Sequence, residues 1–122
     1  MILDHIGMNV SDFARARAFL VQALQPLGIV VVGEGEGWAM LGRDGKGQFW
    51  FGAFGAAPGP IHVAFAADDR AQVRAFHAAA LAAGGRDNGG PGLRPQYHPN
   101  YYGAFVIGPD GHNVEAVCHQ PE

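Results

Sequence analysis

Apolar runs bounded by turn residues alternate along this chain with segments whose apolar positions recur at helical spacing. Residues 3–10 form an apolar run that predicts a strand. A helix is predicted next, with Ser11 or Asp12 as its N-cap and with Pro26 and Gly28 at its end. The apolar stripe of this helix is Phe13, Ala16, Leu20, Leu24 and Leu27. Further short apolar runs predict strands at residues 29–32, 38–41 and 48–51. The first half therefore indicates a βαβββ unit.

The second half repeats the first at an offset of 57 residues, which places His5 on His62. The other matches at this offset are Asp12 with Asp69, Ala14 with Ala71, residues 17–19 with 74–76, and residues 23–24 with 80–81. A repeat of this size predicts one domain, residues 1–122, made of two βαβββ modules at residues 1–54 and 60–119. A linker rich in Gly and Pro joins them. The predicted fold class is α+β, with a helix on one face of each sheet and the other faces free to build a cavity.

Asp68 or Asp69 is the predicted cap of the second helix, which ends at Gly84 and Gly85. Its predicted stripe is Val73, Phe76, Ala80 and Leu81. Residues 86–100 predict a loop with a short strand, and residues 101–107 and 112–119 predict a hairpin around residues 109–111. A three-residue loop there pairs Phe105 with Glu115. The same reasoning in the first module sets Trp38 opposite Trp50, and His112, beside the turn, is expected to be exposed.

Composition narrows the class of protein. The hydrophobic fraction of 48% is enough for a real core, and a net charge of -3 with scattered signs argues against a nucleic-acid surface. No apolar run approaches the length of a membrane helix, and no signal peptide is indicated. A single cysteine, Cys118, fits a reducing cytoplasm. The chain has no threonine and one serine, Ser11, so hydroxyl nucleophile chemistry is almost excluded.

A metal site is the chemistry that the polar residues of the strands favour. Glu115 lies in an otherwise apolar strand, where an ionised carboxylate is costly unless it is paired or bound to a cation. Strand alternation turns Glu115 away from the helix. If the sheets curl together, Glu115 converges with His5 and His62, and such a set suits Fe(II), Mn(II), Zn or Ni. In the alternative interpretation, the histidines bond to the backbone and Glu115 pairs with an arginine.

The chain resembles the vicinal oxygen chelate superfamily, which includes glyoxalase I, bleomycin-resistance proteins and extradiol dioxygenases. The resemblance rests on residues 4–12, on residues 61–65 and, most specifically, on residues 105–115. It implies two paired βαβββ modules around a cavity and assigns metal-ligand positions to His5, His62 and Glu115. Glyoxalase I has a fourth ligand, a glutamate, on the last strand of its first module. Trp50 stands at that position here, which argues against glyoxalase I activity.

Further residues are candidates for the wall of the cavity or for acid–base chemistry. Trp38, Trp50 and Phe105 would form an aromatic wall, and Arg94 precedes the last hairpin. Tyr101 shares the face of Phe105 and could orient a substrate oxygen, or it could be an ordinary half-buried strand residue. His98 lies in a loop that can reach over the cavity, which makes it a candidate acid or base; the alternative is a solvent-exposed histidine.

Two functions fit this sequence. The leading hypothesis is a cytoplasmic metal-dependent enzyme of the lyase, isomerase or dioxygenase type, acting on a small substrate with vicinal oxygens. The alternative is a metal-free protein that binds a small molecule, as bleomycin-resistance proteins do. A homodimer is expected, because open sheet faces bearing large aromatic side chains would otherwise be exposed. Each site could then be built from one chain or from two.

Overall fold

The computed structural model describes residues 4–55 and 59–122, which form two consecutive modules: a βαβββ module, and a second module in which two short strands replace the single strand after the helix. The elements of the first module are β1 (Ile6–Asn9), α1 (Phe13–Leu24), the 3-10 turn η1 (Gln25–Leu27), β2 (Val30–Gly35), β3 (Trp38–Arg43) and β4 (Lys46–Gly52). Those of the second are β5 (His62–Ala66), α2 (Arg70–Ala82), β6 (Arg86–Asp87), β7 (Gly92–Leu93), β8 (Tyr102–Ile107), η2 (Pro109–Gly111) and β9 (Asn113–Cys118). The α+β prediction is confirmed. Residues 56–58 of the predicted linker (residues 55–60) lie outside the described residues. So does residue 3, the first residue of the predicted N-terminal strand.

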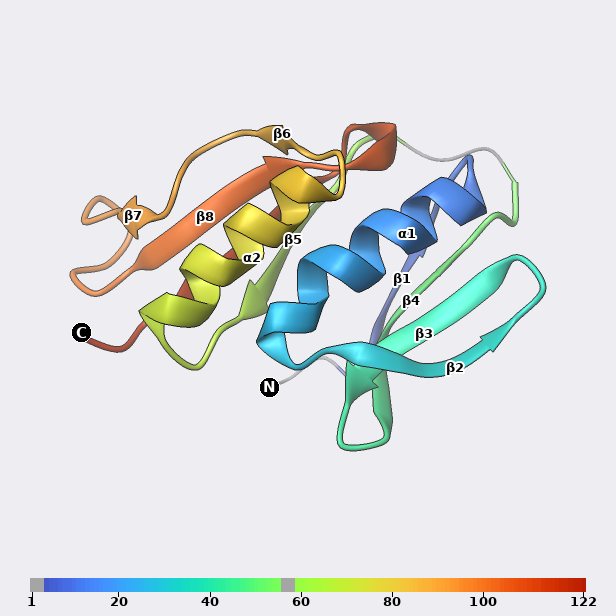
Figure 1. Cartoon of the computed structure of the whole chain (residues 1–122), viewed down its shortest axis with the longest axis horizontal. Helices are drawn as coiled ribbons and strands as arrows, with labels where there is room; N and C mark the ends of the chain where they lie inside the picture. The colour runs from blue at the N-terminus through green and yellow to red at the C-terminus, as the bar shows by residue number, and fades with distance from the viewer. Residues whose placement is uncertain (1–3, 56–58) are drawn as a thin grey trace.

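Each module builds one sheet with the same strand order. The sheets run β1-β4-β3-β2 and β5-β9-β8-β6, with β7 also pairing to β8. The first and last strands of each module pair in parallel, β1 with β4 and β5 with β9. Figure 1 shows both helices on the same side of the sheets, lying next to each other, and α1 and α2 contact one another there. The core lies between this helix layer and the two sheets.

Successive side chains of a strand point to opposite faces of the sheet, and packing shows which face the helices cover. In β4, Phe49 and Phe51 are buried, and the ring of Phe51 stacks on Phe13 of α1 with centroids 5.7 Å apart. In β9, Val114, Ala116 and Cys118 are buried on the equivalent face. The helix-covered faces are therefore those predicted from alternation. Glu115 belongs to the opposite face of β9.

The aspartates are the helix caps, so the alternatives left open by the sequence are resolved. Asp12 accepts a hydrogen bond from the Arg15 amide at 3.1 Å, and Asp69 accepts one from the Gln72 amide at 2.8 Å. Ser11 has a different role, because its amide and hydroxyl both donate to the carboxylate of Asp110. That contact ties the start of α1 to the turn between β8 and β9.

Two predictions about side-chain exposure were wrong. Leu81 is 37% exposed, because α2 ends at Ala82 and turns Leu81 away from the stripe formed by Val73, Phe76 and Ala80. His112 is only 2% exposed, although it follows a turn. Its Nδ1 accepts a hydrogen bond from the Ile61 amide at 3.0 Å, which joins the start of β9 to the start of β5. A backbone donor thus holds this imidazole inside.

The register predicted for the last hairpin is confirmed, and the register predicted for the first is wrong. Phe105 pairs with Glu115 across η2. In the first module, Trp38 pairs with Gly52, and Met40 is the residue opposite Trp50. The turn there has two residues, Asp44 and Gly45, both with positive φ, and the register shifts again between Leu41 and Gly42. A shorter turn followed by a bulge moves the pairing by two positions.

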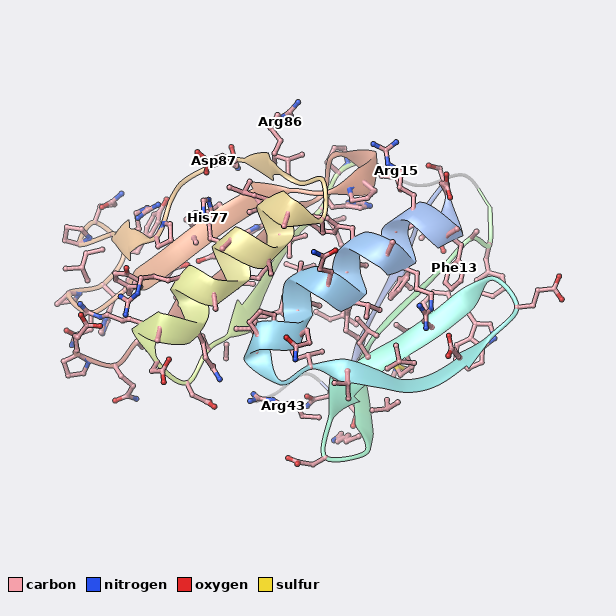
Figure 2. The ribbon with its side chains drawn as sticks, viewed as in Figure 1. Phe13, Arg15, Arg43, His77, Arg86 and Asp87 are labelled. Atoms are coloured by element: carbon pink, nitrogen blue, oxygen red, sulfur yellow. The ribbon has the colours of Figure 1, made fainter. Side chains whose placement is uncertain are left out.

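The loop before β8 is pinned at its start. The imidazole Nε2 of His77 lies 3.0 Å from Oδ1 of Asp87, so α2 holds β6 in place. Figure 2 shows these two side chains close together and Arg86 pointing out from the molecule. Neither of the helices found among the described residues is long and apolar enough to cross a membrane.

Candidate metal and substrate site

Glu115 is the buried acid of the site. It is 1% exposed and lies in the central strand of its sheet, paired with Ala64 of β5 on one side and with Phe105 of β8 on the other. Its Oε1 lies 2.9 Å from Nε2 of His62, and its Oε2 accepts a hydrogen bond from the hydroxyl of Tyr101. Both carboxylate oxygens therefore have partners, which offsets the cost of burial.

The backbone sets the protonation of His62. Its Nδ1 lies 3.1 Å from the carbonyl oxygen of Asn113. A carbonyl can only accept, so Nδ1 carries a proton and donates it. Nε2 then faces the carboxylate of Glu115, and a nitrogen and an oxygen this close need a proton or a metal ion between them. Ligating histidines characteristically donate their other N–H to a carbonyl in this way.

Tyr101 is a fixed hydrogen-bond donor. Burial, followed by the hydrogen bond and the negative charge of Glu115, raises the pKa of Tyr101 well above its ordinary value of 10. The phenol therefore stays protonated at neutral pH and keeps donating to Oε2. Gly103, two residues further along the chain on the same face, leaves room for this bond. A Cβ there would lie 3.1 Å from Oε2 and 3.1 Å from Cε1 of the Tyr101 ring.

Phe105 and Arg94 form one side of the site. The ring of Phe105 stacks on the imidazole of His62 with centroids 6.1 Å apart and an angle of 26° between the planes. The guanidinium carbon of Arg94 lies 5.4 Å from the centroid of the same ring. Both residues were predicted to line the pocket from their place in the sequence. Phe105 lies beside His62 and pairs with Glu115, whereas Arg94 contacts the Phe105 ring.

His98 lies further out. Its side chain is exposed, and its Nδ1 accepts a hydrogen bond from the Asn100 amide at 3.1 Å. Its ring packs edge-on against His119 at 5.5 Å, and His119 in turn packs against Tyr101 at 5.2 Å. Its contact with the site thus runs through His119. A role for His98 as acid or base remains a prediction.

His5 lies away from this cluster. Its side chain is 59% exposed, and its Nδ1 contacts Oδ1 of the neighbouring Asp4 at 2.9 Å. It lines a cavity of about 120 Å³ between β1 and β5, together with Ala64 and Ala66. The cavity thus lies between the start of β1 and the end of β5, while His62 stands at the start of β5. Over the described ranges, no group of three or more His, Cys, Asp or Glu side chains is close enough to hold a metal ion.

The first module carries an aromatic residue where the second carries its acid. Trp50 pairs with Gly7 in the way that Glu115 pairs with Ala64. The indole packs over Gly7, where a Cβ would come within 3.1 Å of it, and stacks on Phe54 with ring centroids 5.2 Å apart. Trp38 lies on the same face of the sheet, near Gly35. The structural equivalence of Trp50 and Glu115 agrees with the position assigned to Trp50 from the sequence.

Sequence reasoning missed the backbone parts of this site. The carbonyl of Asn113 orients His62, and glycines in the loop after β6 surround Arg94. A carbonyl leaves no signal in a sequence. The glycines at positions 89, 90 and 92 were visible, but they indicated only a loop.

The fold and the site together define a class of protein. It has two repeated modules, and the second module carries a histidine on its first strand and a buried acid on its last strand. Residues 2–116 match the family model of the Glyoxalase/Bleomycin resistance protein/Dioxygenase superfamily. The chain belongs to this superfamily, which confirms the resemblance seen in the sequence. Members of the superfamily often use divalent metals.

Solved structures show the same fold over nearly the whole chain. A glyoxalase/bleomycin resistance protein from Albidiferax ferrireducens T118 is 26% identical, with a TM-score of 0.83 over 99% of this chain and 100% of that one. A glyoxalase/bleomycin resistance protein/dioxygenase family enzyme from Burkholderia phytofirmans PsJN is 16% identical, with a TM-score of 0.73 over 96% of this chain and 98% of that one. The oxidase ChaP-H2 is 19% identical, with a TM-score of 0.67 over 99% and 94%. The curated proteins include no match to the chain.

Proposed function

We propose that the protein is a divalent-metal-dependent enzyme that acts on a small substrate with vicinal oxygens. One observation carries the proposal: Nε2 of His62, with Nδ1 committed to a carbonyl, points at the buried carboxylate of Glu115 from 2.9 Å. A nitrogen lone pair and an anion in contact are stable only with a cation between them. A proton serves in the metal-free protein, and a divalent ion is the other cation that both ligands suit.

The contacts of each residue indicate its proposed role in the site. His62 and Glu115 would hold the metal, and the metal would act as a Lewis acid toward substrate oxygens. Tyr101 binds one oxygen of Glu115 and so leaves the other to face His62. Phe105 and Arg94 would receive the substrate beside them. Zn, Ni, Mn and Fe(II) all accept such ligands, so the metal is assigned by class only.

The third donor is proposed to be His5 of a second copy of the chain. His5 is exposed and lies on the other sheet, away from His62 of its own chain. The sheet faces opposite the helices carry half-buried aromatic residues, including Trp50 and Phe105, and Phe54 is 60% exposed. A two-fold dimer would cover these faces and bring His5 of each chain toward the other chain's pair.

The reaction is proposed to be of the lyase, isomerase or dioxygenase type. The glyoxalase I isomerisation needs a carboxylate at the fourth corner of the metal site. Trp50 occupies the equivalent strand position of the first module, and an indole neither ligates a metal nor accepts a proton.

Metal content tests the proposal. Protein purified without chelators should contain about one divalent ion per chain by elemental analysis, and metal-stripped protein should rebind Zn²⁺ or Mn²⁺ with release of protons. Proton release is expected because the ion displaces the proton shared by His62 and Glu115. Purified protein without metal, with no rebinding to stripped protein, would refute the proposal.

A metal-free binding protein is the second candidate, and a different observation favours it. Tyr101 and His62 together satisfy both oxygens of Glu115 from within the chain. The stacked pair Trp50 and Phe54 offers an aromatic surface to a planar ligand. Binding of an aromatic ligand by metal-stripped protein, unchanged by added Zn²⁺, would favour this function over the enzyme.

A further inference from the structure

We infer that Arg94 is a carboxylate-binding residue, so that the ligand of this site is a small carboxylate with an oxygen on the neighbouring carbon. The assignment of that ligand as the substrate rests on the proposed function. The carboxylate site itself is made by Arg94 and its loop and does not need the metal.

Neutral groups hold the guanidinium in place without cancelling its charge. Nη1 donates to the carbonyl of Gly92 and Nη2 to the carbonyl of Gly90, each at 2.9 Å. Several of the five N–H donors of the group remain free. The ion pairs among the described residues do not include Arg94. A planar cation with free donors and no acidic partner suits a carboxylate, which it can bind through two parallel hydrogen bonds.

The loop around Arg94 is built to hold the guanidinium closely. A Cβ at Gly92 would come within 3.1 Å of Nη1, and a Cβ at Gly89 would come within 3.1 Å of both Nη2 and the Phe105 ring. Gly89 also has a φ of +143°, which favours glycine. Its carbonyl accepts from the Phe105 amide at 2.8 Å, which fastens the loop to β8. Arg94 is therefore fixed in position before any ligand arrives, so little order is lost on binding.

Phe105 links this cation to the metal-binding pair. Its ring contacts the guanidinium at 5.4 Å and the imidazole of His62 at 6.1 Å, and its backbone pairs with Glu115. The proposed ligand lies along Phe105, with its carboxylate on Arg94 and the adjacent oxygen toward His62. This arrangement points to 2-hydroxy or 2-oxo carboxylates and to ortho-hydroxybenzoates. A neutral diol or dicarbonyl would leave Arg94 unused.

Two probes that differ only in a carboxylate measure how much the negative charge of the ligand contributes to binding. Salicylate and salicylamide share a ring, an ortho hydroxyl and a carbonyl, and only salicylate carries a carboxylate. Binding of each is measured by fluorescence or calorimetry on the wild type, Arg94→Gln and Arg86→Gln, both metal-free and with Zn²⁺. Arg86 is exposed and points outward at the start of the same loop (Figure 2), so its variant removes the same charge from nearby.

The wild type should prefer salicylate to salicylamide by about tenfold to a hundredfold, the usual range for hydrogen bonds to a charged group. Arg94→Gln should lose that preference, and Arg86→Gln should keep it within about twofold. If Arg94→Gln does not fold, Arg94→Lys should lower the preference severalfold, because an ammonium lacks the two-pronged fork.

Equal binding of the two probes by the wild type, or a preference that survives the loss of Arg94, would overturn the inference. If Arg94 only braced the loop, its variants would weaken both probes alike, which also overturns it. Failure of the proposed function has a different signature: Zn²⁺ would not bind, while the salicylate preference of the metal-free protein would still depend on Arg94.

Discussion

Replacing Glu115 with glutamine tests the metal site with little disturbance of the fold. The change keeps the shape of a side chain that is 1% exposed, and the amide oxygen can still accept from Tyr101. It removes the negative charge 2.9 Å from Nε2 of His62. Because the imidazole is about half exposed, solvent already screens that ion pair. The free energy of unfolding of the metal-free protein should therefore change by less than about 1 kcal/mol.

The loss in metal affinity should be much larger. One unit charge on each group, about 4 Å apart, gives an attraction of about 4 kcal/mol at an effective dielectric constant of about 20, and the second charge of a divalent ion makes this a lower limit. If the lower cost of burying a neutral amide offsets half of this, about 2 kcal/mol remains, which is roughly thirtyfold in Kd. Calorimetric titration of metal-stripped protein with Zn²⁺ measures this change directly.

A matched control separates the site from a general effect of charge. Glu34→Gln removes a carboxylate of β2 that is 49% exposed and pairs with Arg17 at 3.0 Å. It should bind Zn²⁺ as the wild type does. If Glu115→Gln kept the stoichiometry and Kd of the wild type, Glu115 would not be a ligand and the reasoning about His62 would fail with it.

Three further predictions follow from the same geometry. Trp50→Glu should tighten Zn²⁺ or Ni²⁺ binding, because Trp50 occupies the place of Glu115 in the first module; destabilisation without tighter binding would show that Trp50 is not at a corner of the metal site. Light scattering should give twice the mass of one chain, and a mixture of His5→Ala and Glu115→Gln chains should regain up to one intact site per mixed dimer; no regained binding would mean that each site comes from one chain. Because the folded state raises the pKa of Tyr101, the stability tied to its protonated phenol is complete below pH 10 and falls as the pH rises past that value. Tyr101→Phe should lack this alkaline loss in urea unfolding, and parallel pH profiles for the two proteins would contradict it.

The sequence predicted most of the fold because its repeat and its apolar periodicities agree. The apolar runs marked the main strands, and the aspartates before each helix marked where it begins. The exposure of Leu81 and His112 was mispredicted for local reasons. Leu81 lies where α2 is about to end, and His112 is held inside by the Ile61 amide, a partner 51 positions away in the chain.

The site could be predicted in part. Glu115, Tyr101 and Phe105 share one face because strand alternation and the three-residue turn fix the pairing of β8 with β9. His62 joins them through the parallel pairing of β5 with β9. The position of Trp38 could not be derived, since it depends on a two-residue turn and a bulge. At Gly42 the backbone of Lys46 comes so close that a Cβ would overlap its carbonyl oxygen, and such an approach is visible only in three dimensions.

The place of β9 in its sheet also has a consequence for the order of folding. β9 is synthesised after the other strands of its sheet, yet it lies between β5 and β8, and its parallel pairing joins His62 to Asn113. Contacts between residues so far apart in the chain close slowly, because a long loop must be ordered before they form. The first module can close its sheet once Gly52 has been made, whereas the second must wait for β9.

A nascent chain therefore passes through a stage with one finished sheet and one that still lacks its central strand. During that stage the second sheet that packs against α1 and α2 is incomplete. Apolar residues of β5 and β8 are then exposed, because β9 does not yet lie between them. Such surfaces are where larger folds misassociate during synthesis. The strand that completes the second sheet is also the one that carries Glu115, so the acid of the site arrives in the same step that closes the fold.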